Sequence, residues 1–421
     1  MKPAGSLARH LATAARRRPE ALAMSCAGQN WTFAELLAET GALGATLEGG
    51  AAPLVVAGSG LDLARHAYAC SLENRPFWPV DRNRSVHWTG ELPPRVALVI
   101  ATSGSEGEPR GVMLSNANLD AAAAAANRHL PLAAGDLWLD CLPLHHIGGL
   151  AILWRCARAG AGVLLHDGFD ATTVAADLAR QPVTHLSLVP AMLARLLETG
   201  VTPPASLRHV MIGGAALSQA LHDRARAAGW PLNPSYGMSE TAAQIATWTP
   251  ADGPWHEGLV GRPLGRNEFA LAADGRLRIR GPQVMAGYLD GSGIDADGWL
   301  TTGDLGEIDA FGRLTVTGRA DDMLISGGRN VHPLEIESCL AACPGVRDVA
   351  VTGLPDPVWG DLIVALVVGE AEPAHLRAWS EARLPGPARP RRIVRLPDLP
   401  RNAAGKLERA ALRRLAREAT A

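Results

Sequence analysis

The sequence predicts an α/β fold with a large N-terminal domain of parallel-sheet α/β layers, a small β-rich subdomain and a small α+β C-terminal domain. A chain of 421 residues is too long for one typical hydrophobic core, so more than one domain is expected. Apolar strand-like segments and helix-like segments alternate between residues 53 and 228, which is typical of a parallel sheet. From residue 255 the pattern changes to short strands and turns, which favours a separate β-rich region.

The composition excludes several classes of partner. Lysine and arginine number 40 against 42 aspartates and glutamates, so the net charge of −2 offers no footprint for nucleic acid or an anionic membrane. No apolar stretch approaches the ~18 residues that a membrane helix needs. The segment 2–18 is basic, but it runs into a helix-like pattern without a secretory apolar core, so we discount a targeting peptide. Small molecules or a local protein contact are the expected partners.

The cysteines indicate a reducing compartment. Six are scattered along the chain, and the closest pair, Cys339 and Cys343, has a spacing that matches no common zinc signature. We therefore expect reduced, mostly buried thiols in a cytoplasmic protein.

The first 80 residues already show the βαβ pattern of a parallel sheet. Thr32 stands three residues before Glu35, which predicts a capping box at a helix start. The expected elements are helices over 6–18, 32–47 and 61–72 and strands over 53–57 and 77–80.

A glycine-rich loop follows the apolar run 96–100. Its sequence, ATSGSEGEPRG over 101–111, leaves backbone N–H groups free to wrap phosphate oxygens. It lacks the Gly-Lys-Ser/Thr ending of a Walker A loop, which disfavours an ordinary P-loop NTPase. A structural turn is the alternative interpretation. The candidate phosphate-binding residues are Thr102, Ser103, Gly104, Ser105 and Gly107.

Two further junctions carry candidate site residues. In Leu142–Gly149, LPLHHIGG, proline and glycines bracket His145 and His146, which can serve a structural or a functional role. The loop 212–216 places Gly214 and Ala215 where backbone can approach a ligand, although tight helix packing would also explain its glycines. The surrounding elements are strands over 137–141, 162–165, 184–189 and 208–212 and helices over 116–127, 170–180, 190–199 and 217–228.

The segment Pro234–Thr241, PSYGMSET, is more specific. Tyr236 offers a flat face for a purine, and Gly237 lets the chain turn. Ser239 and Glu240 bring a hydroxyl and a carboxylate to where Mg²⁺ and phosphate can bind.

The remainder of the chain contains short strands, a charged turn and a small terminal module. Strands are expected over 269–271, 276–280 and 285–288, then a helix after Pro333 and strands over 346–352 and 361–368. Asp304 alone would be a turn residue, and Lys406 alone a solvated charge.

Taken together, five motifs spread over nearly the whole chain resemble the adenylate-forming superfamily, which includes acyl-CoA synthetases, peptide-synthetase adenylation domains and luciferases. The motifs occur in that family's order, at 102–111, 142–149, 234–241, 302–304 and 397–409. The resemblance implies an N-terminal adenylation domain over 1–320 and a mobile C-terminal domain over 321–421, with the hinge near Asp321.

The resemblance also implies roles for single residues. Asp304 would bind the ribose with Arg319 supporting it, and Gly327 and Gly328 would form the CoA channel. Lys406, Glu240, His146 and Arg110 would be catalytic, with Glu240 also binding the metal.

The implied reaction is an ATP-dependent ligation of a carboxylic acid to coenzyme A with Mg²⁺. The acid and ATP would give acyl-AMP and pyrophosphate, and a thiol would then displace AMP. Leu153–Arg155 and Thr184–Pro190 make the central region most similar to the o-succinylbenzoate:CoA ligases of menaquinone biosynthesis. An enzyme that loads an aryl acid onto a carrier protein would share every motif and stays open, as does a homodimer.

The chain departs from the family pattern at two positions. Arg110 replaces the loop lysine and presents a planar fork, and Ser239 replaces a threonine. Glu106 adds a negative charge inside the phosphate loop, which the sequence does not explain. A catalytically inactive nucleotide-binding regulator is disfavoured because Glu240, Asp304 and Lys406 are all present.

Overall fold

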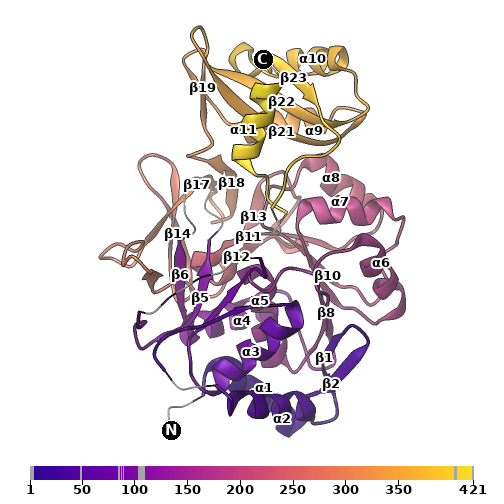
Figure 1. Cartoon of the computed structure of the whole chain (residues 1–421). Coiled ribbons are helices and arrows are strands. Elements are labelled where there is room, and N and C mark those ends of the chain that lie inside the picture. Colours follow the sequence, from indigo (N-terminus) through magenta and orange to yellow (C-terminus); the bar gives the residue numbers. More distant parts are fainter. Residues whose placement is uncertain are drawn as a thin grey trace.

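The computed structural model describes residues 4–47, 50–83, 86, 88, 90–102, 110–402 and 405–419. Figure 1 shows the C-terminal part, residues 321–402 and 405–419, stacked on the N-terminal part, which comprises the described residues up to 320. Among the described residues, no helix combines the length and the apolar character that crossing a bilayer requires. The predicted α/β class with a small C-terminal region is confirmed.

The largest sheet of the described residues is parallel through its centre, as predicted. Its strand order is β12-β11-β10-β9-β7-β8-β1-β2. In its centre, β7 pairs in parallel with β8 and β9, and β10 pairs in parallel with β9 and β11. At the two edges, β12 pairs antiparallel with β11, and β2 pairs antiparallel with β1. The strands are β1 (Leu22–Cys26), β2 (Gln29–Thr32), β7 (Leu137–Asp140), β8 (Gly162–Leu165), β9 (His185–Leu188), β10 (His209–Ile212), β11 (Leu232–Met238) and β12 (Ala243–Thr247).

A second sheet carries the expected phosphate loop. Its order is β16-β6-β5-β4-β3, with β3, β4 and β5 parallel and β6 returning antiparallel to β5. The strands are β3 (Leu54–Ala57), β4 (Phe77–Val80), β5 (Val96–Ala101), β6 (Gly111–Ser115) and β16 (Gly287–Tyr288). The segment from Ser103 to Pro109 lies outside the described residues.

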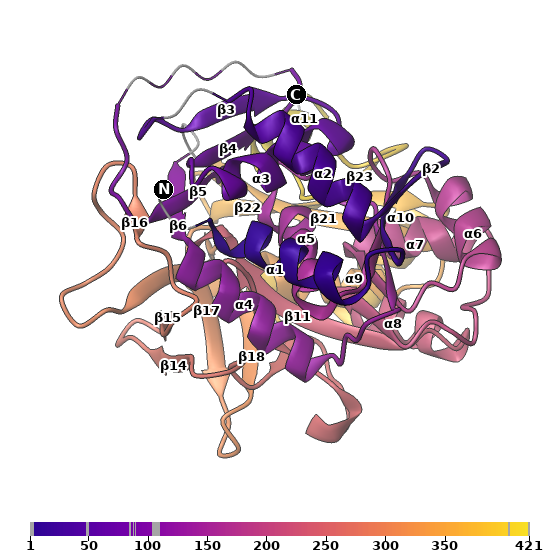
Figure 2. The ribbon, with the colours of Figure 1, turned by 90° about the horizontal axis from the view of Figure 1, so that it is seen from below.

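Helices pack between and around these sheets in two main hydrophobic clusters, one with α1 to α5 and one with α6 to α8. Figure 2 shows α1, α4 and α5 together below the sheets, and their apolar faces share a cluster with Leu98 of β5 and Val163 of β8. The predicted capping box is confirmed, because Thr32 N donates to Glu35 Oε2 at 2.8 Å and Glu35 N donates to Thr32 Oγ1 at 3.2 Å. The helices of the N-terminal part are α1 (Ser6–Arg17), α2 (Phe33–Gly44), α3 (Gly60–Leu72), α4 (Asn116–His129), α5 (Ile147–Ala159), α6 (Ala171–Arg180), α7 (Pro190–Glu198) and α8 (Gln219–Ala227).

The β-rich region predicted after residue 255 forms an antiparallel sheet. Its order is β13-β18-β17-β15-β14, and its hairpin register sets Asp304 opposite Arg319. The strands are β13 (Leu259–Gly261), β14 (Glu268–Leu271), β15 (Arg276–Arg280), β17 (Leu300–Ile308) and β18 (Leu314–Arg319).

The C-terminal part has its own core and more elements than the sequence predicted. The expected strands are longer than predicted because they pair with each other as a continuous hairpin, β21 with β22. The prediction missed β23, α10 and α11. The elements are β19 (Leu324–Ser326), β20 (Arg329–Val331), α9 (Pro333–Ala341), β21 (Val346–Asp356), β22 (Gly360–Gly369), α10 (Pro373–Glu381), β23 (Arg392–Arg395) and α11 (Arg409–Glu418).

The cysteine prediction agrees with the structure. All six thiols are free, and only Cys339 is more than slightly accessible. Burial raises the pKa of Cys70 to about 12, so this thiol stays protonated at neutral pH.

Candidate functional site

A cleft of about 1890 Å³ lies where the N-terminal and C-terminal parts meet. Its walls come from the ends of β5, β10 and β11, from β17 and β18, and from α9 and the chain before α11. Most predicted site residues line it, namely Thr102, Arg110, Gly214, Ala215, Tyr236, Gly237, Ser239, Glu240, Asp304, Arg319 and Lys406. Ser103, Gly104, Ser105, Glu106 and Gly107 lie outside the described residues.

The β11 end brings a tyrosine and a carboxylate into this cleft. Gly237 sits in an irregularity of the β11–β12 ladder, where a Cβ atom would lie 2.1 Å from the carbonyl oxygen of Ala243. Only glycine fits there without moving backbone. The chain then turns through Ser239–Thr241, and the backbone of Glu240 is fixed by Met285 N, which donates to its carbonyl at 2.8 Å.

Asp304 is held from two sides. The Tyr236 hydroxyl donates to Oδ2 at 2.6 Å, and Arg319 Nη1 donates to Oδ1 at 3.3 Å. Burial and, next, the charge of Asp304 raise the pKa of Tyr236 well above its ordinary value, so the hydroxyl remains a donor. The carboxylate is therefore oriented, and each oxygen keeps a lone pair for a ligand hydroxyl.

Glu240, like Asp304, accepts a hydrogen bond from a tyrosine hydroxyl. The Tyr288 hydroxyl donates to Glu240 Oε1 at 2.7 Å. The guanidinium carbon of Arg110 lies 3.6 Å from the centre of the Tyr288 ring, and Arg110 Nη2 lies 2.9 Å from Asp290 Oδ2. The second cleft carboxylate is thus also fixed by a phenol and has a cation nearby.

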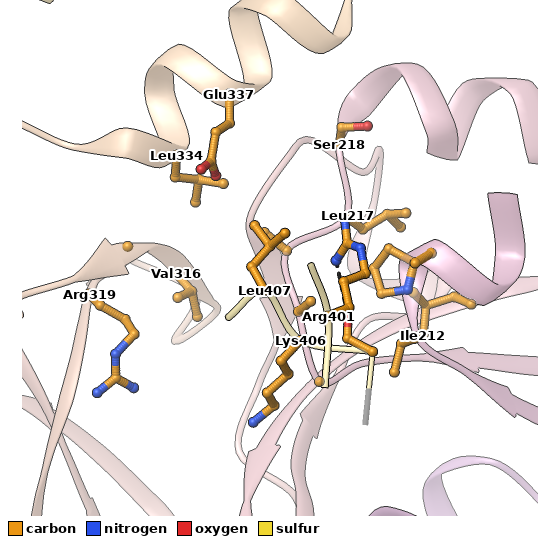
Figure 3. Close-up of a pocket in the computed structure, with 18 of the residues that line it drawn as sticks. Ile212, Leu217, Ser218, Val316, Arg319, Leu334, Glu337, Arg401, Lys406 and Leu407 are labelled. Atoms are coloured by element: carbon orange, nitrogen blue, oxygen red, sulfur yellow. Dashed lines mark hydrogen bonds between the residues drawn. The ribbon is translucent and has the colours of Figure 1, made fainter. Parts of the chain in front are cut away.

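Lys406 comes from the C-terminal part and points into the cleft toward the side where Arg319 lies (Figure 3). Its backbone N–H donates to Asn402 Oδ1 at 3.1 Å. Arg401 supports the same turn, because it donates to the Gly405 carbonyl at 3.0 Å and to both oxygens of Asp348 at 2.8 and 3.0 Å. The turn is therefore anchored to β21.

The charge of Lys406 faces the two fixed carboxylates. The side chain stays accessible to solvent in the open cleft, yet the surrounding protein desolvates it and lowers its pKa. Asp304 and Glu240 act in the opposite direction and favour the ammonium form. The lysine is thus positioned to neutralise negative charge that develops on a bound ligand.

His146 lies near this charge but is not part of the cleft wall. It precedes α5, and its ring centre is 4.4 Å from that of His145. Burial, together with the charges of His145 and Lys406, lowers the pKa of His146 to about 4, so the ring is neutral at physiological pH. His145 Nε2 lies 3.5 Å from Asp81 Oδ2.

The remaining predicted residues lie at the edge of the cleft or beyond it. Asp321 is exposed and pairs with Arg319 at 3.1 Å. Gly327 and Gly328 form the β19–β20 turn, outside the cleft lining, and Gly327 faces the ring of Trp359. The structure therefore brings Lys406 together with the predicted nucleotide-binding residues that it describes, and it keeps the predicted CoA-channel glycines apart from them.

Sequence reasoning missed a buried cation below the cleft floor. Arg155 of α5 is 1% exposed, and its Nη1 donates only to Met211 Sδ at 3.7 Å. Its Nε and Nη2 have no hydrogen-bond partner among the described residues. Burial raises the pKa of neighbouring Asp140 well above its ordinary value, which makes Asp140 a weak counter-ion for Arg155. The motif Leu153–Arg155 indicated the class of substrate. It did not indicate that the Arg155 side chain is buried with two nitrogens that lack a hydrogen-bond partner among the described residues.

Comparisons with known proteins show what this chain is similar to. The AMP-binding enzyme family model matches residues 73–289, and the AMP-binding enzyme C-terminal domain model matches residues 335–406. The 2-succinylbenzoate–CoA ligase of Listeria monocytogenes serotype 4b is 38% identical over 323 residues, which covers 75% of this chain and 69% of the relative. The corresponding ligase of Bacillus cereus is 36% identical over 337 residues, covering 76% and 70%.

Two solved structures of a synthetase from Bacillus subtilis are similar to this chain in fold. The o-succinylbenzoate CoA synthetase of Bacillus subtilis in complex with the acyl-adenylate intermediate OSB-AMP superposes with a TM-score of 0.84 at 29% identity, over 96% of this chain and 97% of that one. The same synthetase in complex with ATP and a magnesium ion also gives 0.84 at 29% identity, covering 96% and 98%.

The Asp304 site yields a direct binding prediction. Asp304→Ala should weaken ATP binding by about 1–3 kcal/mol, because charge-assisted hydrogen bonds to the ribose are lost. Isothermal titration calorimetry measures this affinity. Glu307→Ala is the matched control, since Glu307 is an exposed carboxylate on the same strand outside the cleft lining. Unchanged ATP affinity in Asp304→Ala would mean that the nucleotide does not bind here.

Proposed function

The chain belongs to the AMP-binding enzyme family, and we propose that it is an ATP-dependent 2-succinylbenzoate–CoA ligase that works through an acyl-AMP intermediate. One observation carries the proposal. Lys406 enters a cleft in which Asp304 and Glu240 are each fixed by a tyrosine hydroxyl. This arrangement suits a nucleotide whose ribose is bound at one carboxylate and whose phosphates, with their cation, lie at the other.

In the first half-reaction a carboxylate oxygen of the acid attacks the α-phosphorus of ATP, and the bond to the pyrophosphate oxygen breaks. Such a step needs charge neutralisation more than proton transfer. The Lys406 ammonium stabilises the negative charge on the α-phosphoryl oxygens, Asp304 holds the ribose hydroxyls, and the Tyr236 ring packs against the purine.

The residues present fit a magnesium ion that ATP brings with it. Glu240 Oε1 receives the Tyr288 hydroxyl, which leaves Oε2 available to a cation. Among the described residues, no three His, Cys, Asp or Glu side chains gather closely enough to hold a metal by themselves. Mg²⁺ typically binds through one or two carboxylates and substrate phosphates. Glu240 would hold the ion, which supplies neutralisation of phosphate charge.

Arg155 supports an acid with a second carboxylate. A buried guanidinium with two unpartnered nitrogens is costly unless an anion pairs with it. 2-Succinylbenzoate has two carboxylates, and only one becomes the acyl-adenylate. Arg155 contacts Met211, whose neighbour in the chain, Ile212, lines the cleft, so we place the carboxylate that does not react at Arg155.

The second half-reaction needs another arrangement of the two parts. The CoA sulfur attacks the acyl carbonyl carbon, the thioester bond forms, and AMP leaves with the electrons of the broken acyl–phosphate bond. We place the domain boundary at 320/321, with the hinge at exposed Asp321. Rotation there would withdraw Lys406 and bring the turn of Gly327 and Gly328 to the cleft.

The proposal is tested with a panel of aromatic and aliphatic acids, ATP, Mg²⁺ and CoA, with AMP release as the readout. We expect AMP and a CoA thioester with 2-succinylbenzoate. Thioester formation confined to fatty acids would refute the substrate. If the acyl group were transferred only to a pantetheinyl carrier protein, that protein and not CoA would be the acceptor. The free thiols support a cytoplasmic location.

The role of Arg155 yields a prediction about selectivity. Arg155→Ala should lower kcat/KM for 2-succinylbenzoate by about 10²-fold or more, because the substrate carboxylate that does not react would be buried without its cationic partner. With 3-benzoylpropionate, which lacks the ring carboxylate, the same variant should lose little. Arg158→Ala is the control, since Arg158 lies one turn along α5 and is exposed. Equal losses with both acids would contradict the pairing and indicate a purely structural arginine.

A contact between the two parts tests the rotation. A Cβ atom at Gly405 would lie 2.6 Å from Val189 Cγ2, where α7 begins, so Gly405→Ala should clash only while Lys406 is in the cleft. We expect about a tenfold loss or more in adenylation, since small misplacements of a positioned group are costly. Conversion of supplied acyl-AMP and CoA should stay near the parent rate.

The matched second variant is Val189→Ala in the Gly405→Ala background. It removes the clashing methyl groups and should restore part of the adenylation rate, whereas backbone strain at Gly405, whose φ is +75°, would not be relieved. Equal losses in both half-reactions without restoration would contradict a contact that exists in one arrangement only.

A further inference from the structure

We infer that Tyr288 is a positioning residue for adenylation, because its hydroxyl fixes the Glu240 carboxylate and its ring anchors Arg110. The inference rests on the proposed function, and in it the Tyr288 ring holds the Arg110 cation in the cleft where the nucleotide phosphates would lie. Tyr288, Glu240 and Arg110 all line the cleft. Three groups from distant stretches of sequence therefore act as one unit.

The hydroxyl end of Tyr288 is set for donation. It lies 2.7 Å from Glu240 Oε1. A tyrosine hydroxyl is a hydrogen-bond donor at neutral pH, so it can hold this contact with the carboxylate. One carboxylate oxygen is thereby occupied and the rotation of Glu240 is restricted, which leaves the other oxygen in a defined place.

The ring face of Tyr288 holds Arg110. The guanidinium carbon lies 3.6 Å from the ring centre, and Nη2 reaches Asp290 Oδ2 at 2.9 Å and the Ser292 hydroxyl. Hydrogen bonds from Ser292 and then the Arg110 cation lower the pKa of Asp290 to about 2, which keeps it ionised. A planar guanidinium can stack and donate at once, which a lysine ammonium cannot do in the same way.

The backbone also fixes β16, the strand that carries Tyr288, against β6. Gly287 and Tyr288 pair with Met113 and Val112 of β6, and Leu289 N donates to the Gly111 carbonyl at 2.9 Å. A Cβ atom at Gly111 would lie 2.3 Å from Leu289 Cδ1, so the approach is close.

The chain just before this strand also reaches Glu240, because Met285 N donates to the Glu240 carbonyl at 2.8 Å. The segment 285–292 therefore joins the start of β6 to the turn that carries Glu240. Tyr288 adds a side-chain contact to each end of this connection.

Calorimetric titration of ATP, with and without Mg²⁺ and without acid or CoA, tests the inference. Tyr288→Phe keeps the ring and removes the hydroxyl, so affinity for ATP with Mg²⁺ should fall about tenfold, the scale of one hydrogen bond to a charged group. Affinity for ATP without Mg²⁺ should stay unchanged. Tyr68→Phe, which removes a buried hydroxyl of α3 far from the cleft lining, should change neither.

Tyr288→Leu tests the ring. It also unstacks Arg110, so affinity for ATP without Mg²⁺ should now fall as well, in protein whose near-UV circular dichroism matches the parent. Equal losses with and without Mg²⁺ in Tyr288→Phe, or identical behaviour of the Phe and Leu variants, would overturn the inference. Failure of the proposed function shows separately, as no acid- and CoA-dependent AMP release by the parent.

Discussion

The arrangement of the whole molecule depends on bringing one ammonium group to two carboxylates. Lys406 belongs to the C-terminal part, whereas Asp304 and Glu240 belong to the N-terminal part. Desolvation opposes a charge in this cleft, and the two carboxylates favour it. Contacts between the two parts maintain this arrangement, including Gly405 against Val189 and the Ser338 hydroxyl, which donates to Glu257. These contacts belong to the arrangement that brings Lys406 into the cleft.

The choice of lysine at this position stands out against the composition. The sequence has only one other lysine, Lys2, and uses arginine for its other strongly basic positions, including Arg110. A guanidinium is a broad planar fork, whereas an ammonium is a compact point charge on a flexible stem. Arg110 stacks on a ring and pairs with a side chain, which suits the fork. Lys406 has to reach between two carboxylates, which suits the point charge.

Both cleft carboxylates are prepared in the same way. Tyr236 and Tyr288 each donate a hydroxyl to one oxygen of Asp304 and of Glu240, at 2.6 and 2.7 Å. The pKa of each phenol is raised by burial and by its carboxylate partner, so neither loses its donor. Preorganised charges of this kind stabilise a transition state without reorganising during the reaction. Two of the three tyrosines in the sequence therefore fix a cleft carboxylate.

Much of the fold and part of the site could be predicted from the sequence. The parallel strands follow from alternation of apolar segments, and Tyr236, Glu240, Asp304 and Lys406 lie in short motifs whose order is specific. The strand β6 and the helices α10 and α11 were missed, because short strands and short helices depend on packing partners distant in sequence.

Tyr288 and Arg155 were missed as functional residues for a different reason. Their importance comes from contacts in space. Two nitrogens of the buried Arg155 have no hydrogen-bond partner among the described residues, and the Tyr288 hydroxyl meets a carboxylate 48 positions away. No local pattern reports such a distance.

The most direct measurement compares the two half-reactions in Lys406→Ala. If the ammonium serves adenylation alone, formation of acyl-AMP from acid and ATP should fall by about 10²–10³-fold, the loss expected for one preorganised charged donor. Conversion of supplied acyl-AMP and CoA to the thioester should proceed close to the parent rate, because the proposed rotation would have withdrawn the lysine from the cleft by then. Equal losses in the two half-reactions would contradict the account, since one fixed arrangement would then serve both steps.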